Sequence, residues 1–339
     1  MRRIALIVLV IALAASTGFS QFAKVGTAGM QFLDIAVSTR AVGMGNVFSA
    51  FANDASALFW NPAGMENLPT GEAWAGMVSW PADIYLNAAA AVLKVGDLGH
   101  FGVNFRMLDV GLMKRTDVFN PAGNGGTFGV LDWSAGVSYS RSLTDRFAIG
   151  VTFNWIHEEL AGYKDDTWAF DIGGYYNTGW QGVTLGFAIL NFGPNMNFAV
   201  DDDSDGLIDE DLRNGLDDDG DGLVDEDLEQ ADVPTPVAFK FGVKFPLLTQ
   251  GDSKLDLGAE VIHPNDNVEL YNVGAEYWLM NMVAIRGGYS INQDTGSGVS
   301  AGAGFKLNVS GDMAVFVDYA FADMGILDFA HRASVGFSF

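Results

Sequence analysis

Short segments in which apolar residues alternate with polar or small residues recur along most of this chain. The last segment, residues 331–339, places alanine, valine and two phenylalanines on one face and arginine, glycine and two serines on the other. This period of two predicts a β-strand with one apolar face and one polar face.

Fourteen such segments follow Thr70, and each has about the 9–11 residues that a tilted membrane-spanning strand needs. In residues 235–246, Lys240 and Lys244 fall on the polar face. We expect that face to line a lumen, because a lysine buried in lipid near the midplane costs about 2–4 kcal/mol. The segments lie near residues 71–80, 84–95, 99–110, 131–140, 146–158, 165–176, 181–191, 235–246, 253–263, 267–278, 282–290, 297–309, 312–321 and 329–339.

Two architectures produce this alternation. In a soluble sandwich, the apolar faces of two sheets pack against each other. In a transmembrane barrel, they face lipid. Apolar residues make up 49% of the chain, charged residues 18%, and the mean hydropathy is +0.18. Because closed barrels satisfy every backbone polar group in lipid, we favour an all-β fold: an antiparallel transmembrane β-barrel of about fourteen strands over residues 71–339, in a bacterial outer membrane.

The chain begins with a pattern typical of a secretory signal peptide. Arg2 and Arg3 precede an apolar run of twelve residues, Ile4 to Ala15, and small residues precede Gln21. The run is shorter than the roughly 20 residues of a spanning helix. Residues 1–20 are therefore predicted to be a cleaved signal peptide, with an uncleaved anchor as the alternative. The chain has no cysteine, so it has no disulfide framework.

Residues 21–70 lack strand periodicity. They are rich in alanine, glycine and methionine, and Gly43-Met44-Gly45 and Asn61-Pro62-Ala63-Gly64 interrupt them. A short helix is predicted over Asp54–Trp60, ended by Pro62. We interpret this segment as a hatch inside the barrel, because a lumen of this size is too wide for wall side chains alone to fill.

The connections between the predicted strands alternate in length. Those expected on the periplasmic side are short, whereas residues 111–130 and 192–234 are long. Short periplasmic turns and longer extracellular loops are typical of outer-membrane barrels. The final Phe337 and Phe339 resemble the aromatic ending that barrel-assembly machinery reads, and this ending is expected in the periplasm.

One extracellular insert, residues 195–234, carries most of the acidity. The formal net charge is −24, and residues 201–232 contribute −15. Two copies of an Asp-x-Asp-x-Asp-Gly pattern lie sixteen residues apart and resemble the calcium loops of thrombospondin type 3 and dockerin-like repeats. Leu212 and Leu228 replace the glutamate expected at position 12 of an EF-hand. The predicted calcium ligands are Asp201, Asp203, Asp205, Asp209, Asp211, Asp217, Asp219, Asp221, Asp225 and Asp227. A disordered acidic tract is the alternative.

The candidate hatch carries a family resemblance. Ser38 to Gly45, followed by Ala52 to Gly64, resembles the start of PorV/PorQ-family outer-membrane proteins. The Asn-Pro-Ala-Gly element also recurs in FadL-type long-chain fatty acid transporters. The resemblance implies a fourteen-stranded barrel with an N-terminal hatch. Its motif residues here are Arg40, Gly43, Met44, Gly45, Asp54, Asn61, Pro62, Ala63 and Gly64.

Three functions are open, of which the resemblance implies the first two. A PorV-like barrel belongs to the type IX secretion system and handles secreted cargo proteins together with secretion-system components. This is the main hypothesis. A FadL-like barrel admits hydrophobic small molecules, and apolar lumen-facing residues beneath the hatch would favour it. The third is a structural surface scaffold with a calcium-stiffened loop.

Other classes are not indicated. The four histidines are dispersed, no Gly-x-Ser-x-Gly occurs, and Gly123–Gly126 lacks the strand-to-helix context of a phosphate loop. We therefore predict no catalysis. No basic patch is present to neutralise phosphates, so nucleic acid is not an expected partner. The expected partners are outer-membrane lipid and the barrel-assembly machinery.

Overall fold

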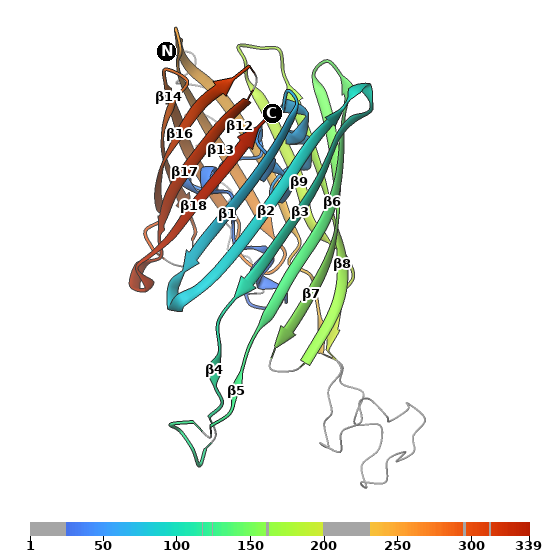
Figure 1. Ribbon diagram of the computed structural model, residues 1–339, viewed down its shortest axis with the longest axis vertical. Helices are drawn as coiled ribbons and strands as arrows, with labels where there is room; N and C mark the ends of the chain where they lie inside the picture. Colours follow the sequence, from blue (N-terminus) through green and yellow to red (C-terminus); the bar gives the residue numbers. More distant parts are fainter. Residues whose placement is uncertain are drawn as a thin grey trace.

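The computed structural model describes residues 25–116, 118–123, 125–160, 163–198, 231–293, 296–311 and 313–339. In them, fourteen strands close into one barrel in the order β1-β18-β17-β16-β15-β14-β13-β12-β9-β8-β7-β6-β3-β2 (Figure 1). Their bounds are β1 Gly71–Trp80, β2 Ile84–Val95, β3 Gly99–Asp109, β6 Leu131–Thr144, β7 Phe147–Leu160, β8 Tyr163–Asn177, β9 Thr184–Phe192, β12 Ala238–Gln250, β13 Ser253–Pro264, β14 Leu270–Leu279, β15 Val283–Ile291, β16 Val299–Ser310, β17 Met313–Asp323 and β18 Phe329–Ser338.

All neighbouring strands are antiparallel, and the first strand pairs with the last. The register runs from Glu72 opposite Ser338 to Ser79 opposite His331. Backbone bonds between Gly71 and Phe339, 3.1 and 3.0 Å long, complete this seam. The predicted all-β class, the strand number and the antiparallel closure are confirmed. Closure leaves no strand edge unpaired, which is the condition for a sheet in lipid.

The two faces of the wall have different side chains, as the alternation predicts. Along β7, Ile149, Val151 and Trp155 are exposed on the outside, whereas Gly150 and Thr152 are buried against the interior. Neighbouring aromatics stack on the outer face, for example Phe105 with Trp133 at 6.3 Å between ring centroids. Lys240 and Lys244 contact rings of the segment inside the barrel, so both face the lumen as predicted.

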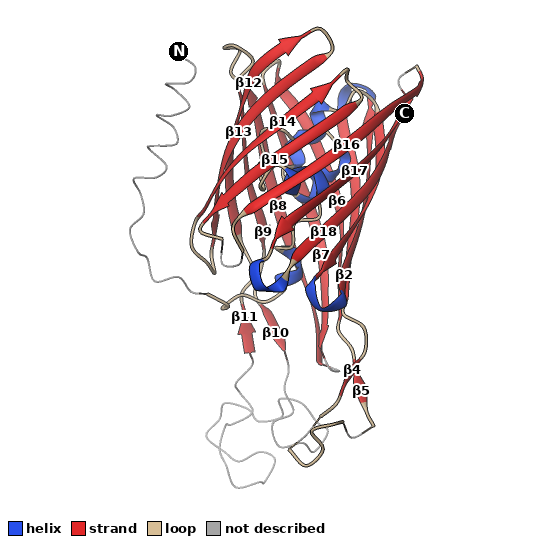
Figure 2. Ribbon diagram, turned by 90° about the vertical axis from the view of Figure 1, so that its left-hand side faces the viewer, coloured by secondary structure: helices blue, strands red, loops and turns tan. Residues whose placement is uncertain are grey.

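The connections differ between the two ends of the barrel. At one end, here the short-connection end, the strands join through short turns such as residues 144–147 and 310–313. At the other, the long-connection end, two small antiparallel strand pairs extend beyond the wall: β4 (Met113–Lys114) with β5 (Thr127–Phe128), and β10 (Met196–Phe198) with β11 (Ala231–Val233) (Figure 2). The C-terminus lies at the short-connection end. Which end faces the cell exterior remains a prediction.

Residues 25–70, here the luminal segment, pass through the barrel between its ends. Gly29 donates to the Pro234 carbonyl at the long-connection end, 3.0 Å away, and Gly71 follows the segment at the seam. Figure 2 shows its short helices between the strands. They are η1 (Gln31–Leu33), α2 (Thr39–Gly43), η2 (Ala55–Phe59) and η3 (Pro62–Asn67), and the remaining 3-10 turns are η4 (Pro81–Asp83), η5 (Gly96–Leu98) and η7 (Gly325–Leu327).

Side-chain caps explain where these short helices begin. Ser38 accepts from the Ala41 N–H at the start of α2, Asp54 from the Ser56 N–H before η2, and Asn61 from the Ala63 N–H before η3. A capping oxygen satisfies an N–H that the first turn leaves unpaired. The helix predicted over Asp54–Trp60 exists as the 3-10 helix η2. No helix within the described residues is long and apolar enough to span a membrane.

Candidate functional site

A belt of glycines on eight consecutive strands receives the luminal segment. A Cβ added at Gly186 would lie 2.1 Å from the Ser49 carbonyl oxygen, and one at Gly274 would lie 2.1 Å from the Met44 oxygen. Real Cβ atoms do not approach so closely, so the backbone of the segment contacts the backbone of the wall. From β7 to β16 the belt comprises Gly150, Gly173, Gly186, Gly242, Gly258, Gly274, Gly288 and Gly302.

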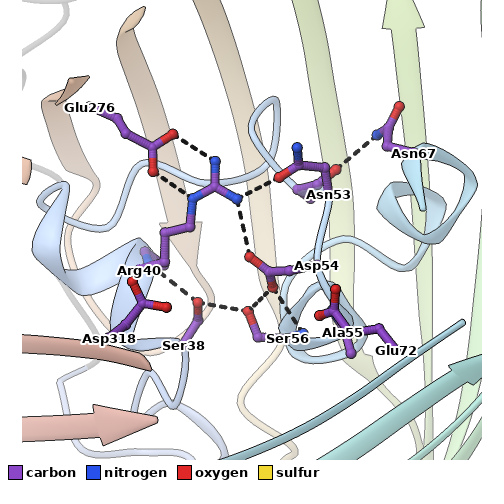
Figure 3. A network of polar contacts seen from close by, with 12 residues as sticks. Ser38, Arg40, Asn53, Asp54, Ala55, Ser56, Asn67, Glu72, Glu276 and Asp318 are labelled. Carbon is purple, nitrogen blue, oxygen red and sulfur yellow. Dashed lines mark hydrogen bonds and ion pairs between the residues drawn. The ribbon is translucent and has the colours of Figure 1, made fainter. Parts of the chain in front are cut away.

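Arg40 of α2 joins the luminal segment to the wall through a buried carboxylate (Figure 3). Its Nε and Nη2 donate to the two oxygens of Glu276 on β14, at 2.7 and 2.6 Å. Its Nη1 donates to Asn53 at 2.5 Å and to Asp54 at 3.1 Å. Burial alone would lower the pKa of Arg40, but Glu276 and Asp54 outweigh burial and raise it. The guanidinium therefore stays charged.

Glu276 serves two arginines at once. Arg286 on β15 donates through Nε to Glu276 at 2.8 Å, and its Nη1 bonds Asp318 on β17. The side chains of Glu276 and Arg286 are each only 1% exposed. The segment is therefore held by a largely buried charge cluster, in which Arg40, Asp54 and Asp318 are 13%, 15% and 11% exposed. Loss of one member would leave the others buried and uncompensated, which is the costly case for buried ion pairs.

A second carboxylate of the wall binds the segment through uncharged donors. Glu260 on β13 accepts from the backbone N–H groups of Phe48 and Ser49 at 2.7 and 2.8 Å. The Ser49 hydroxyl and the Trp60 indole also donate to it, at 2.7 and 2.8 Å. Lys240 lies on the other side of that indole, with its Nζ 3.5 Å from the ring centroid. Glu260 thus fixes the turn and the aromatic side chain together.

A third contact anchors the end of the segment at the short-connection end. Glu66 accepts from the Ser140 hydroxyl at 3.0 Å and from the Ser142 backbone and hydroxyl at 3.1 and 2.8 Å. The ring nitrogens of His100 lie 2.8 Å from Glu66 and 2.9 Å from the Leu68 carbonyl. Burial would raise the pKa of Glu66, but the His100 and serine contacts together lower it.

The luminal segment leaves a cavity of about 330 Å³ toward the long-connection end, here the long-end cavity. Just over half of its lining residues are apolar, and the large ones are Leu33, Ile35, Val37, Phe59, Trp60, Trp80, Leu190, Ile262, Leu270 and Met324. The polar lining residues are Gln31, Asp34, Asn46, Arg106, Asp171, Asn191, Lys240, Asp266, Asn267 and Gln293. The Asp34 side chain is open to the cavity, but the surrounding protein limits its hydration. Burial and the negative charge of Asp266 raise the pKa of Asp34. The positive charges of Lys240 and Arg106 lower it, but by less.

A second cavity, of about 440 Å³, lies toward the short-connection end and is here the short-end cavity. Its lining is mostly charged or amide-bearing. Phe51, Trp278 and Phe316 supply its aromatic surface. The charged residues are Arg40, Lys244, Lys254, Arg286, Lys306, Asp54, Glu72, Asp256, Glu276 and Asp318, and the amides are Asn53, Asn281 and Asn308. The luminal segment therefore separates a chamber of mixed apolar and polar lining from one lined mostly by charged and amide side chains.

The sequence-predicted motif residues all lie in the luminal segment. Arg40 and Asp54 meet in the charge cluster, and Asn61 donates to the Ser49 and Gly174 carbonyls at 2.9 and 3.1 Å. Gly43, Met44 and Gly45 lie against β14, β15 and β16, and Pro62 and Ala63 lie against Gly150; Gly64 packs on Ala52. Whether this segment acts as a hatch remains a prediction.

The wall residues of the site were missed in the sequence. Glu260, Glu276, Arg286 and Asp318 all occupy lumen-facing positions, as their burial shows. Strand alternation could have placed these charges inside, because an unpaired charge facing lipid is disfavoured. It could not have shown which of them meet Arg40.

Other predicted sites are placed only in part. The calcium ligands within residues 201–227 and the signal peptide, residues 1–20, lie outside the described residues. Among the described residues, no group of three or more His, Asp or Glu is arranged to hold a metal ion. Phe337 and Phe339 stack on the outer face at 5.9 Å between centroids. Their recognition by the barrel-assembly machinery remains a prediction.

Solved structures similar to this chain include hydrocarbon channels and transporters. The toluene transporter TodX of Pseudomonas putida superposes with a TM-score of 0.56 at 13% identity, covering 88% of this chain and 97% of TodX. The Ralstonia pickettii toluene transporter TbuX superposes with a TM-score of 0.53 at 11% identity, covering 88% of this chain and 96% of TbuX. The monoaromatic hydrocarbon channel CymD superposes with a TM-score of 0.55 at 12% identity, covering 89% of this chain and 97% of CymD. At this identity the likeness establishes the fold alone. No protein-family model and no curated protein matches the chain.

Proposed function

We propose that this protein is an outer-membrane channel that takes small hydrophobic molecules into the long-end cavity. The large apolar and aromatic side chains that line part of that cavity carry the proposal, since small-molecule sites are concave and combine apolar surface with placed polar groups. The fold shared with hydrocarbon channels supports it. This is the alternative that the FadL-type resemblance offered, and it takes precedence over the secretion hypothesis.

Entry and onward passage are separate steps in this proposal. The long-end cavity holds a solute against Phe59 and Trp60 of the luminal segment, and the short-end cavity begins on the other side of that segment. The contacts of Arg40, Glu260 and Glu66 hold the segment in between. Passage therefore requires part of the segment, or the side chains beside it, to move.

Uptake of radiolabelled toluene by expressing cells tests the proposal. Ala238 is a small, buried residue lining the long-end cavity, so Ala238→Trp fills part of it and should lower the uptake rate. Ile35→Asp places a charge in the same cavity and should do likewise. Ala91→Trp, on the exposed outer face, is the matched control and should leave uptake unchanged. Equal uptake by Ala238→Trp, Ile35→Asp and wild type would refute the proposal.

We also infer that the long-connection end faces the cell exterior. The asymmetry of the connections supports this orientation. Because the chain has no cysteine, a single cysteine at Lys114 of the β4–β5 hairpin should react with an impermeant maleimide on intact cells. A cysteine at Asp145, in a short turn, should not. The opposite pattern would reverse the orientation.

The type IX secretion hypothesis rests on the sequence resemblance alone. No contact among the described residues adds to it. Its test is copurification of secreted proteins and secretion-system components with the tagged barrel from crosslinked cells. The scaffold hypothesis likewise rests on the acidic insert.

A further inference from the structure

We propose that the short-end cavity is a binding site for a small organic anion, held by Lys244 and Lys306. This site is distinct from the long-end cavity, and the proposal does not depend on hydrocarbon uptake. It follows from which charges in the cavity already have partners.

The carboxylates around Lys244 are engaged by other cations. The charged groups that face Lys244 are Lys254, Asp256, Arg40 and Glu276. Asp256 pairs with Lys254 at 2.7 Å, and Glu276 is shared by Arg40 and Arg286 at 2.6 and 2.8 Å. No described carboxylate lies at ion-pair distance from Lys244. Its ammonium is half-buried and rests 5.5 Å from the centroid of the Phe51 ring.

Lys306, on β16, is also without an ion pair among the described residues. The carboxylate that it influences is Glu72, which accepts the Ala55 N–H at 2.6 Å and makes no close contact with Lys306. Asp318 is bonded to Arg286. Glu72 has no described cation at ion-pair distance, and its described hydrogen bond is to a backbone N–H. The cavity therefore contains two lysines, on β12 and β16, without an ion pair among the described residues.

Lys244 and Lys306 are both half-buried, and a partly buried charge gains from a partner of opposite sign. The five cations and five carboxylates of the lining balance formally, so the site rests on the two lysines without ion pairs, to which an anion would bind. The volume of about 440 Å³ exceeds the needs of a simple ion, and Trp278, Phe51 and Phe316 add aromatic surface to the lining. The expected ligand therefore has a carboxylate or phosphate group and a compact apolar body.

Isothermal titration with the full-length protein in a neutral detergent tests this site. Benzoate should bind, and binding should weaken as salt is added, because salt screens the attraction. Lys244→Gln and Lys306→Gln should each weaken binding by about tenfold or more, as expected for a hydrogen bond to a charged group. Lys94→Gln is the control, since Lys94 lies at the same end of the barrel and outside the cavity lining. It should bind benzoate like wild type.

Further ligands separate charge from hydrophobicity. Inorganic phosphate that competes with benzoate identifies a general anion site, and failure to compete identifies an organic carboxylate site. Benzyl alcohol and benzylamine should bind more weakly than benzoate. Because Trp278 lines the cavity, benzoate should change its fluorescence, and Trp278→Phe should remove that change.

Three results would overturn the proposal: no benzoate heat, benzyl alcohol binding as tightly as benzoate, or unchanged affinity in the Lys244→Gln/Lys306→Gln protein. Removal of a lysine without an ion pair leaves no buried acid unpaired, so these variants should fold. Heat-modifiable migration on gels confirms that they do.

Discussion

Glu276→Gln should release the luminal segment from the wall. The glutamate is 1% exposed and accepts three hydrogen bonds from two arginines. Glutamine keeps the shape but loses the charge, so Arg40 keeps only Asp54 and Arg286 keeps only Asp318 as a carboxylate partner. Removing one partner of a buried pair costs about 3–5 kcal/mol. Because each 1.4 kcal/mol changes an equilibrium constant tenfold, the open fraction of the segment should rise about 10²- to 4 × 10³-fold.

Thiol labelling measures this opening, because the chain has no native cysteine. Ala57 of η2 is fully buried, so a cysteine there reacts with a maleimide only when the segment opens. Its labelling rate should rise in the Glu276→Gln background. Glu269→Gln is the matched control: Glu269 pairs with His263 at 3.1 Å in an exposed connection, and its loss should not change the rate.

A third variant separates charge balance from general damage. Replacing all five charged members, with Arg40→Met, Arg286→Met, Glu276→Leu, Asp318→Leu and Asp54→Asn, removes every charge of the cluster and keeps a capping oxygen at the start of η2. Removal of a whole buried charge cluster is often neutral, so labelling should return toward the wild-type rate. Equal labelling of the Ala57→Cys site in wild type and Glu276→Gln would refute the assignment of these charges as the anchor.

Four other outcomes are expected. Gly186→Val should accelerate the same labelling, because its Cβ would meet a luminal-segment carbonyl at 2.1 Å, whereas Gly287→Ala, with open space around it, should not. Acidification should weaken the contacts of Glu66, because its pKa in the folded protein is lowered from the ordinary 4.5. The stabilisation that Glu66 contributes is therefore fully present above pH 4.5 and is lost as the pH falls through its lower folded pKa. Amide hydrogen exchange near residues 65–68 should rise at that pH in the wild type, and it should rise less in Glu66→Gln. Isothermal titration of the intact protein with calcium at several millimolar should show a heat of binding to residues 201–227. Absence of any heat would contradict the predicted calcium sites. Deleting Phe339 removes its two backbone bonds to the first strand and should impair membrane assembly but not export; normal surface levels would count against its predicted role as an assembly signal.

Strand positions were predictable because side-chain alternation and turn residues are local. The ranges predicted for β1 and β2, 71–80 and 84–95, agree with the structure, since Pro81 and the residues after it interrupt the hairpin between them. The start of β12 was predicted three residues early, at 235 rather than Ala238. Pro234 and Pro236 flank the predicted start at residue 235. Their carbonyls accept hydrogen bonds from Gly29 and Asn191 and do not join the hydrogen bonds between strands.

The interior contacts were not predictable in the same way. Arg40 and Glu276 are 236 residues apart in sequence, and their meeting depends on how the luminal segment is turned within the barrel. Alternation places Glu276 inside the barrel but does not give its partner. The capping residues Ser38, Asp54 and Asn61 are local, and their helix-start signals are readable from the sequence.

The chemistry of the inner wall indicates that the luminal segment is part of the folding unit of the barrel. Without it, Glu260 would lose four donors at once, and Glu276 would face Arg286 alone. The glycine belt would lose its packing partner as well. Because each unsatisfied buried polar group costs about 1–3 kcal/mol, an empty lumen must fill with water to remain stable. Opening is therefore expected to proceed by local release near one cavity rather than by loss of the whole segment.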